Sequence, residues 1–189
     1  MTKTILALGD SLCAGFGLPL HSSFASQLQK ALQERNYEVR IINAGISGDS
    51  TAGGLARADR ELKKAPDLVF LELGINDAAM GEDPARIRAN LESIINKIRA
   101  KGVEIILAGT DLPPEFGSQR RQEYSQVFHS LAQEYQLPLI PDLLAGVPGN
   151  PELTLPDGLH PNATGVQKML EHALPVVEKT LQNMQTIKG

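Results

Sequence analysis

Three polar side chains in this sequence have the chemistry that acyl transfer requires. Ser11 follows Gly9 and Asp10 at the end of a short apolar run, and His160 stands three residues after Asp157 in a polar stretch late in the chain. A serine hydroxyl becomes a good nucleophile when a base takes its proton, and a histidine held by a carboxylate can be that base. These residue types predict a nucleophile (Ser11), a general base (His160) and an orienting acid (Asp157).

Acyl transfer also needs N–H donors aimed at the oxygen that becomes negative in the transition state. Three candidates follow strand-like runs: the backbone N–H of Ser11, the backbone N–H of Gly48 and the side-chain amide of Asn76. Glycine leaves its N–H unobstructed, and asparagine supplies two N–H donors where aspartate would supply a repelling charge. The sequence therefore predicts an oxyanion hole formed by Ser11, Gly48 and Asn76.

Each of these residues also suits an ordinary structural role. Ser11 is a typical helix cap, Gly48 and Asn76 are typical turn residues, and Asp157 and His160 suit a surface turn. The structural interpretation requires such roles to coincide after four separate apolar runs, which makes it weaker than the catalytic one. An Asp–His metal site needs a third ligand, and none stands nearby in the sequence, so no metal is predicted.

The elements that would position these residues alternate along the chain. Short apolar runs, typical of strands buried on both faces, alternate with amphipathic stretches of helical period. The apolar runs cover 4–8, 39–42, 68–73, 104–108 and 138–140, and the helical stretches cover 23–35, 51–65, 84–101, 119–135 and 162–183. Pro175 lies within the last stretch and is expected to kink or interrupt that helix.

This alternation predicts an α/β fold. We expect a flavodoxin-like three-layer α/β/α sandwich with a five-stranded parallel sheet in the order 2-1-3-4-5. Residues 1–189 contain no repeat, no low-complexity segment and no linker, so a single domain is expected. Ligands of such sheets bind beyond the carboxyl ends of the strands. The candidate residues follow the first, second, third and fifth apolar runs, and they should therefore meet at one edge.

Composition limits the classes of function. The chain has 189 residues, 42% of them hydrophobic, and a net charge of −4 without any cluster of lysine and arginine. Aromatic residues make up 4% and tryptophan is absent, so the sequence has neither the charge nor the stacking platforms of a nucleic-acid binder. Cys13 is the only cysteine, which rules out an intrachain disulfide and a cysteine metal cluster.

The sequence also bears on membrane insertion and location. No apolar run reaches the roughly 18 residues that a membrane span needs, so stable membrane insertion is not expected. As written, the sequence predicts a cytoplasmic protein, whereas an export signal removed from its N-terminus would make it periplasmic or secreted. The oligomeric state stays open, and a monomer is compatible with the sequence.

Four short blocks resemble the GDSL or SGNH hydrolases in order and spacing. The blocks are G-D-S-L (9–12), the glycine in S-G-D-S (47–50), G-I-N-D (74–77) and D-G-L-H (157–160). The likeness extends from about residue 4 to residue 175 and is nearest to the bacterial thioesterase I, lysophospholipase and arylesterase branch.

The resemblance has implications for fold, cofactor and site. It implies a flavodoxin-like fold that works without a metal or an organic cofactor. It also implies that Ser11 is the nucleophile, that Gly48 and Asn76 contribute to the oxyanion hole, and that His160 and Asp157 complete the triad.

Two segments are candidates for the walls that bind the acyl chain. The segment 109–117 follows the fourth apolar run, where relatives build part of this wall, and its prolines make it stiff. Asp111 and Glu115 would place charge along it, which favours short to medium acyl chains. The small residues 78–80 form the other expected wall. The candidate substrate-binding residues are Ala78, Met80, Leu112, Pro113 and Phe116.

The preferred function is a serine esterase or thioesterase. Its substrates would be small-molecule acyl esters or thioesters, as in arylesterases, acyl thioesterases or lysophospholipases. A carbohydrate O-acetylesterase of the same family is the nearest alternative, and the absence of tryptophan counts mildly against it. A non-catalytic flavodoxin-like binding module is a further alternative, which would require all four motifs to be accidental.

Overall fold

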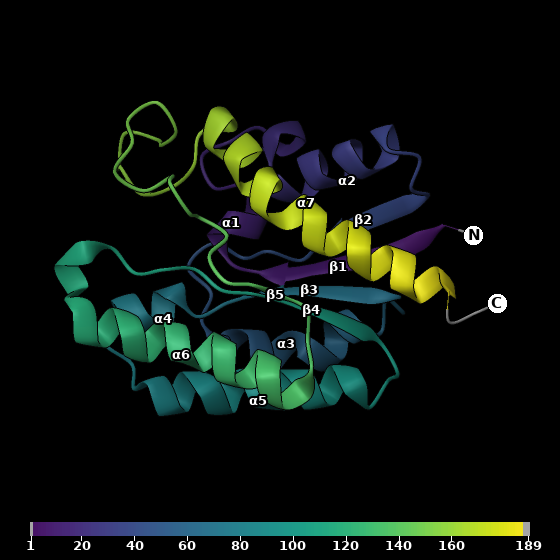
Figure 1. The fold of residues 1–189 in the computed structure, drawn as a ribbon, viewed down its shortest axis with the longest axis horizontal. Helices are drawn as coiled ribbons and strands as arrows, with labels where there is room; N and C mark the ends of the chain where they lie inside the picture. Colours follow the sequence, from purple (N-terminus) through teal and green to yellow (C-terminus); the bar gives the residue numbers. More distant parts are fainter. Residues whose placement is uncertain (1, 187–189) are drawn as a thin grey trace.

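The structure is a computed structural model that describes residues 2–186, and its centre is a five-stranded parallel sheet (Figure 1). The strands are β1 (Lys3–Gly9), β2 (Val39–Asn43), β3 (Leu68–Glu72), β4 (Glu104–Ala108) and β5 (Leu139–Ile140). Their order in the sheet is β2-β1-β3-β4-β5, so the predicted topology is confirmed. All five residues of the central strand β3 are buried, as expected for a strand covered on both faces.

Helices cover both faces of the sheet, which confirms the predicted three-layer sandwich (Figure 1). One layer contains α1 (Ser11–Ala14), α2 (Phe24–Glu34) and α7 (Ala163–Thr186). The other contains α3 (Thr51–Leu62), α4 (Ile75–Ala79), α5 (Pro84–Arg99) and α6 (Ser118–Tyr135). Two 3-10 helices, η1 (Leu20–Ser22) and η2 (Pro114–Phe116), lie in the connections. Each layer buries its own apolar core against the sheet.

Polar side chains fix where three of the long helices begin. Ser23 caps α2, Ser50 caps α3 and Asp83 caps α5, and each accepts a backbone N–H of the first turn. Pro84 occupies the first position of α5, where its missing N–H is not needed. Because the first turn of a helix leaves N–H groups without partners, these caps set the start of each helix relative to the preceding strand.

Helix α7 continues through Pro175, so the interruption that the sequence predicted does not occur. Pro175 is exposed, whereas Ala173, Leu174 and Val177 around it are buried in the core shared with α2. Proline removes one hydrogen bond from the helix, and the packing of this apolar face compensates for the loss.

The carboxyl ends of the strands meet at one edge of the sheet, at the left of Figure 1. The short helices α1 and α4 begin there, and the connections 109–117 and 141–162 fold over the same edge. β1 begins and α7 ends at the opposite side of the molecule. The fold therefore gathers the candidate residues at a single edge, as the strand order requires.

Candidate active site

Ser11 is held at a sharp exit from β1. The strand ends at Gly9 and α1 begins at Ser11, with Asp10 as the N-cap whose Oδ1 accepts the Leu12 N–H at 3.0 Å. A Cβ on Gly9 would lie 2.5 Å from the Sγ of Cys13, so this exit has room for glycine alone. The surrounding chain thus fixes the position of the Ser11 hydroxyl.

Two hydrogen bonds join Ser11 to the turn before α7. Ser11 Oγ lies 3.0 Å from His160 Nε2, and His160 Nδ1 lies 2.7 Å from Asp157 Oδ2. Asp157 Oδ1 also accepts the backbone N–H groups of Leu159 and His160, at 2.9 and 3.0 Å. Gly158 supplies a left-handed turn with a φ of 71°. The fold thus brings the three predicted residues together, although Ser11 and His160 are 149 residues apart in the sequence.

The environment of Asp157 favours its charged form. Partial burial raises the pKa of Asp157, but hydrogen bonds from the Leu159 N–H, the His160 ring and the His160 N–H outweigh burial and hold this pKa below its ordinary value. An ionised carboxylate only accepts hydrogen bonds, so it selects the histidine tautomer that carries its proton on Nδ1. Nε2 then faces the Ser11 hydroxyl as an acceptor, which is the arrangement needed to take its proton.

Two backbone N–H groups at this edge are unused. Among residues 2–186, neither the Ser11 N–H nor the Gly48 N–H has a hydrogen-bond acceptor. Gly48 has a φ of 79°, and a Cβ built on it would meet nothing within 4 Å, so the space beside it is open. Unused N–H donors in an open space are able to bind a negatively charged oxygen.

The Asn76 amide belongs to the same group but is already engaged. Its Nδ2 donates to Asp10 Oδ2 at 3.0 Å and to the Asp49 carbonyl at 2.9 Å. An amide nitrogen has two N–H bonds, so both have an acceptor in this structure. Asn76 thereby links the end of β1 to the loop after β2, and an oxyanion would have to share one of these N–H groups.

A buried pair of acids lies next to Ser11, and one member, Glu72, was not predicted from the sequence. Glu72 Oε2, at the end of β3, accepts the Asp10 N–H at 3.3 Å, and both side chains are buried. Burial raises the pKa of Asp10 to about 6. Burial and the nearby Asp10 carboxylate raise the pKa of Glu72 well above its ordinary value. The sequence signal for Glu72 was its position as a single acidic residue within the apolar run 68–73.

Arg57 of α3 forms hydrogen bonds with the end of β1 and with the segment that follows β2. Its buried guanidinium donates to Asp49 Oδ2 at 2.8 Å, to the Ala44 carbonyl at 2.5 Å and to the Gly9 carbonyl at 2.9 Å. A planar guanidinium with five donors suits such a three-way contact. The spacing of residues did not reveal this role, because Gly9 is 48 residues away in the sequence.

A cavity of about 490 Å³ opens at Asp157, which belongs to its lining, whereas Ser11 and His160 do not. Its lining comes from α4, from the 109–117 connection and from the connection before α7, which contributes Pro148, Gly149 and residues 157–159. Three of the residues predicted to bind substrate, Leu112, Pro113 and Phe116, line this cavity. Its walls are mainly apolar side chains, which suits a hydrocarbon chain.

Helix α4 lines the cavity with residues other than those predicted. Ile75 and Ala79 belong to the lining, whereas Ala78 and Met80 do not. Ala78 is buried in the core, with 2% of its surface exposed, and Met80 extends into solvent with 84% exposed.

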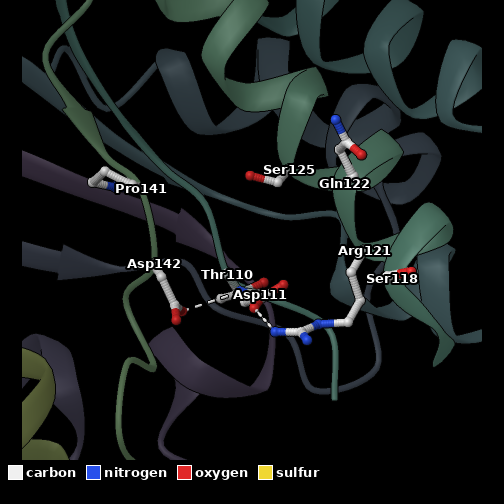
Figure 2. Close-up of a pocket in the computed structure, with 8 residues that line it drawn as sticks. All are labelled: Thr110, Asp111, Ser118, Arg121, Gln122, Ser125, Pro141 and Asp142. Carbon is white, nitrogen blue, oxygen red and sulfur yellow. Dashed lines mark hydrogen bonds and ion pairs between the residues drawn. The ribbon is translucent and has the colours of Figure 1, made fainter. Parts of the chain in front are cut away.

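Asp111 lies outside this cavity, which corrects the expectation that it charges the acyl wall. Figure 2 shows it in a separate pocket of about 360 Å³ between the end of β4 and α6. There it forms an ion pair with Arg121, and its N–H donates to Asp142 Oδ1 at 3.1 Å. Glu115 does line the cavity, so the 109–117 connection contributes one carboxylate to that wall and not two.

Within residues 2–186, no group of three or more His, Cys, Asp or Glu side chains is arranged to hold a metal ion. None of the helices in this described part of the chain is both long and apolar enough to cross a membrane.

Known proteins resemble this chain over most of its length. The sequence model of the GDSL-like Lipase/Acylhydrolase family matches residues 7–168. Esterase TesA of Pseudomonas aeruginosa is 38% identical over 180 residues, which are 95% of this chain and 90% of the relative. Thioesterase 1/protease 1/lysophospholipase L1 of Escherichia coli K12 is 34% identical over 160 residues, 84% of this chain and 76% of the relative. A solved crystal structure of TesA superposes with a TM-score of 0.91 at 38% identity and covers 94% of this chain and 99% of its own.

Proposed function

The chain belongs to the GDSL-like lipase/acylhydrolase family and is a carboxylic ester hydrolase, and from this premise we propose that Ser11, His160 and Asp157 act as its catalytic triad. One observation carries the proposal: Ser11 Oγ lies 3.0 Å from His160 Nε2, and His160 Nδ1 lies 2.7 Å from Asp157 Oδ2. Both distances are within reach of proton transfer or orientation by hydrogen bonding. We further propose that the whole chain forms one domain of this family.

The reaction proceeds in two halves. As Ser11 Oγ attacks the acyl carbon, His160 Nε2 takes its proton, and the charged Asp157 stabilises the imidazolium that forms. When the tetrahedral intermediate collapses, His160 gives this proton to the leaving oxygen or sulfur, and the acyl group stays on Ser11. A water molecule then attacks the acyl group while His160 accepts its proton. The carboxylic acid departs and Ser11 regains its hydroxyl.

We assign the developing oxyanion to the N–H groups of Ser11 and Gly48 and to the Asn76 amide. The first two have no competing acceptor in the described part of the chain, so they are ready without rearrangement. Asn76 would share with the oxyanion the N–H that it gives to the Asp49 carbonyl. Its other bond, to Asp10 Oδ2, would hold the amide in place meanwhile.

The substrates we propose are short- to medium-chain acyl esters and thioesters. The acyl chain would lie in the cavity of about 490 Å³, against Leu112, Pro113 and Phe116. Glu115 in the same wall disfavours a long apolar chain, because its carboxylate would lose water on contact with hydrocarbon. The names of the two relatives, an esterase and a thioesterase/lysophospholipase, support both oxygen and sulfur leaving groups.

Replacement of Ser11 by alanine tests the triad. We expect Ser11→Ala to lower kcat for p-nitrophenyl butyrate by on the order of 10⁴–10⁶, because no nucleophile remains. A fluorophosphonate should add covalently to the wild-type enzyme and not to the variant, as intact-protein mass spectrometry can measure. Ser47→Ala, an exposed serine at the same edge, is the matched control and should keep both activity and labelling. A folded Ser11→Ala enzyme within about tenfold of wild-type activity would contradict the proposal.

A further inference from the structure

Phe16 lies against the ring of the proposed base. The ring centroids of Phe16 and His160 are 4.5 Å apart, and the ring planes make an angle of 40°. Three of the five phenylalanines are buried in the cores, whereas Phe16 leaves 48% of its surface exposed. A single exposed apolar side chain is common on protein surfaces, but this one covers one side of the histidine.

The backbone fixes Phe16 in this position. The N–H groups of Gly15 and Phe16 both donate to the Ser11 carbonyl, at 3.0 and 3.1 Å. Gly15 and Gly17 have φ angles of 83° and 71°, which other residues rarely adopt. A Cβ on Gly17 would lie 2.6 Å from Leu155 Cδ1, so the turn packs closely on the connection before α7. The ring is therefore placed by a turn that is bonded to the nucleophile itself.

The acyl cavity and Phe16 come from different parts of the fold. Phe16 is absent from the lining of the cavity, which α4, the 109–117 connection and the connection before α7 form. The connection between α1 and α2, which carries Phe16, runs with the α2 and α7 layer in Figure 1. Helix α4 and the start of α6 belong to the opposite layer. Phe116 thus lines the cavity, whereas Phe16 contacts His160 from outside it.

We propose that Phe16 is a specificity-determining residue whose exposed ring face forms the wall of a leaving-group subsite. The inference rests on the proposed triad. The acyl carbon carries both the acyl chain and the leaving oxygen, and these substituents diverge once Ser11 has attacked. With the acyl chain in the cavity, the leaving group extends away from it. The leaving group also passes His160, because this residue delivers the proton to the leaving atom.

The chemistry of this wall defines the class of leaving group. A phenyl ring is flat and apolar and offers no ordinary hydrogen-bond donor or acceptor, so it favours an aromatic or otherwise apolar alcohol or thiol over a sugar hydroxyl. In acylation the bond from the acyl carbon to the leaving atom breaks, Ser11 Oγ bonds to that carbon, and the alcohol departs with the proton from His160. Of the two parts of the substrate, Phe16 contacts only the departing group, so the later attack of water on the acyl-enzyme does not require that contact.

Benzyl butyrate and ethyl butyrate test this subsite, because they leave the same butyryl group on Ser11 and release alcohols of different shape. In Phe16→Ala we expect kcat/KM for benzyl butyrate to fall about threefold to tenfold relative to ethyl butyrate, the size of one aromatic contact. Phe16→Leu should show a smaller fall, since it keeps an apolar surface. Leu20→Ala, which changes a side chain 75% exposed in the same connection, is the matched control and should leave the ratio unchanged.

The remaining outcomes separate this inference from the triad. If the ratio is unchanged in a folded Phe16→Ala enzyme while Ser11→Ala is inactive, the subsite is overturned and the triad stands. A parallel fall for both esters, with slower release of butyrate after a p-nitrophenyl burst and a displaced pH profile, also overturns it. Phe16 would then act by positioning His160. If Ser11→Ala stays active, the proposed triad fails, and the subsite falls with it.

Discussion

Asn76 illustrates how a single side chain both braces the site and takes part in the proposed chemistry. Its amide bridges Asp10 Oδ2 and the Asp49 carbonyl, so it holds the nucleophile turn and the Gly48 loop at a fixed separation. Hydrogen bonds in a site without substrate often rearrange when the reacting group arrives. The contact with Asp49 is the one that an oxyanion would compete for, while the contact with Asp10 supports the amide.

Two variants of Asn76 separate the proposed donor role from a role in the turn alone. We expect Asn76→Ala to lower kcat by on the order of 10²–10³ and to leave KM nearly unchanged, because the lost bond exists only in the transition state. Asn76→Asp should be lower still, since its carboxylate would repel both the oxyanion and Asp10. Steady-state kinetics on p-nitrophenyl butyrate, with thermal unfolding of both variants, provides the measurement.

The outcome that would exclude the donor role is the reverse order of the two variants. Asparagine and aspartate share turn preferences, so a residue that only shaped the turn would tolerate aspartate better than alanine. An Asn76→Asp enzyme clearly more active than Asn76→Ala would therefore remove Asn76 from the oxyanion hole.

At the scale of elements, α3 links the two segments that contribute N–H groups to the proposed oxyanion hole. Arg57 reaches from this helix to the Gly9 carbonyl at the end of β1 and to the Ala44 carbonyl after β2. It also pairs with Asp49, which follows Gly48. One buried cation thus fixes the two segments from which the Ser11 and Gly48 N–H groups come.

Removal of this cation should lower the stability of the fold. We expect Arg57→Met to lower the free energy of unfolding by about 3–5 kcal/mol, because it leaves the largely buried Asp49 carboxylate without its partner. Arg60→Met, one turn along the same helix and with a side chain 69% exposed, is the matched control and should cost less than about 1 kcal/mol, because its partner Glu61 keeps the ion pair with Lys64. Urea unfolding measures both. If the free energy of unfolding falls no more in Arg57→Met than in Arg60→Met, the contacts of Arg57 do not stabilise the fold.

Some elements were predictable because their signals are local. Continuous apolar runs identified all five strands, and the rules for parallel sheets then limited their order. Helices α1 and α4 were not predicted, since four or five residues are too few to show a helical period. The break expected at Pro175 did not form, because distant packing on the sheet decides that helix and local preference does not.

The residues of the site likewise include some that short motifs predicted and some that they placed incorrectly. Ser11, Asp157 and His160 stand in short motifs whose residue types suggest their chemistry, and the structure brings them together. The wall at α4 was placed imperfectly because successive residues of a helix face directions about 100° apart. Ala78 therefore enters the core and Met80 enters solvent, while Ala79 faces the cavity.

Across the whole molecule, the buried acids next to Ser11 make stability depend on pH. The pKa of Asp10 is about 6 in the folded protein, against an ordinary value of 3.8. The folded state therefore binds this proton more tightly than the unfolded chain, and protonation favours folding. The contribution of Asp10 to the free energy of unfolding is fully present below about pH 4 and is lost as pH rises through about 6. The raised pKa of Glu72 acts in the same direction.

Asp10→Asn should remove the part of this dependence that belongs to Asp10. We expect the free energy of unfolding of the wild type, minus that of Asp10→Asn, to fall by on the order of 2–3 kcal/mol between about pH 4 and pH 7. Urea unfolding followed by circular dichroism at several pH values measures the difference. Asp59→Asn is the control, because Asp59 is exposed and its hydrogen bond with Lys97 lowers its pKa. A difference for Asp10 that stays flat or rises with pH would contradict the prediction.

The distance in sequence between Ser11 and the proposed base His160 also determines at what point of synthesis the proposed triad can form. A ribosome adds His160 149 residues after Ser11. Until the segment around residues 155–160 has been synthesised and has packed onto the turn at Gly17, the Ser11 hydroxyl has no base and is no more reactive than any other serine. If the proposed triad is correct, a growing chain is therefore inert toward esters and thioesters until the segment that contains His160 has packed against Ser11.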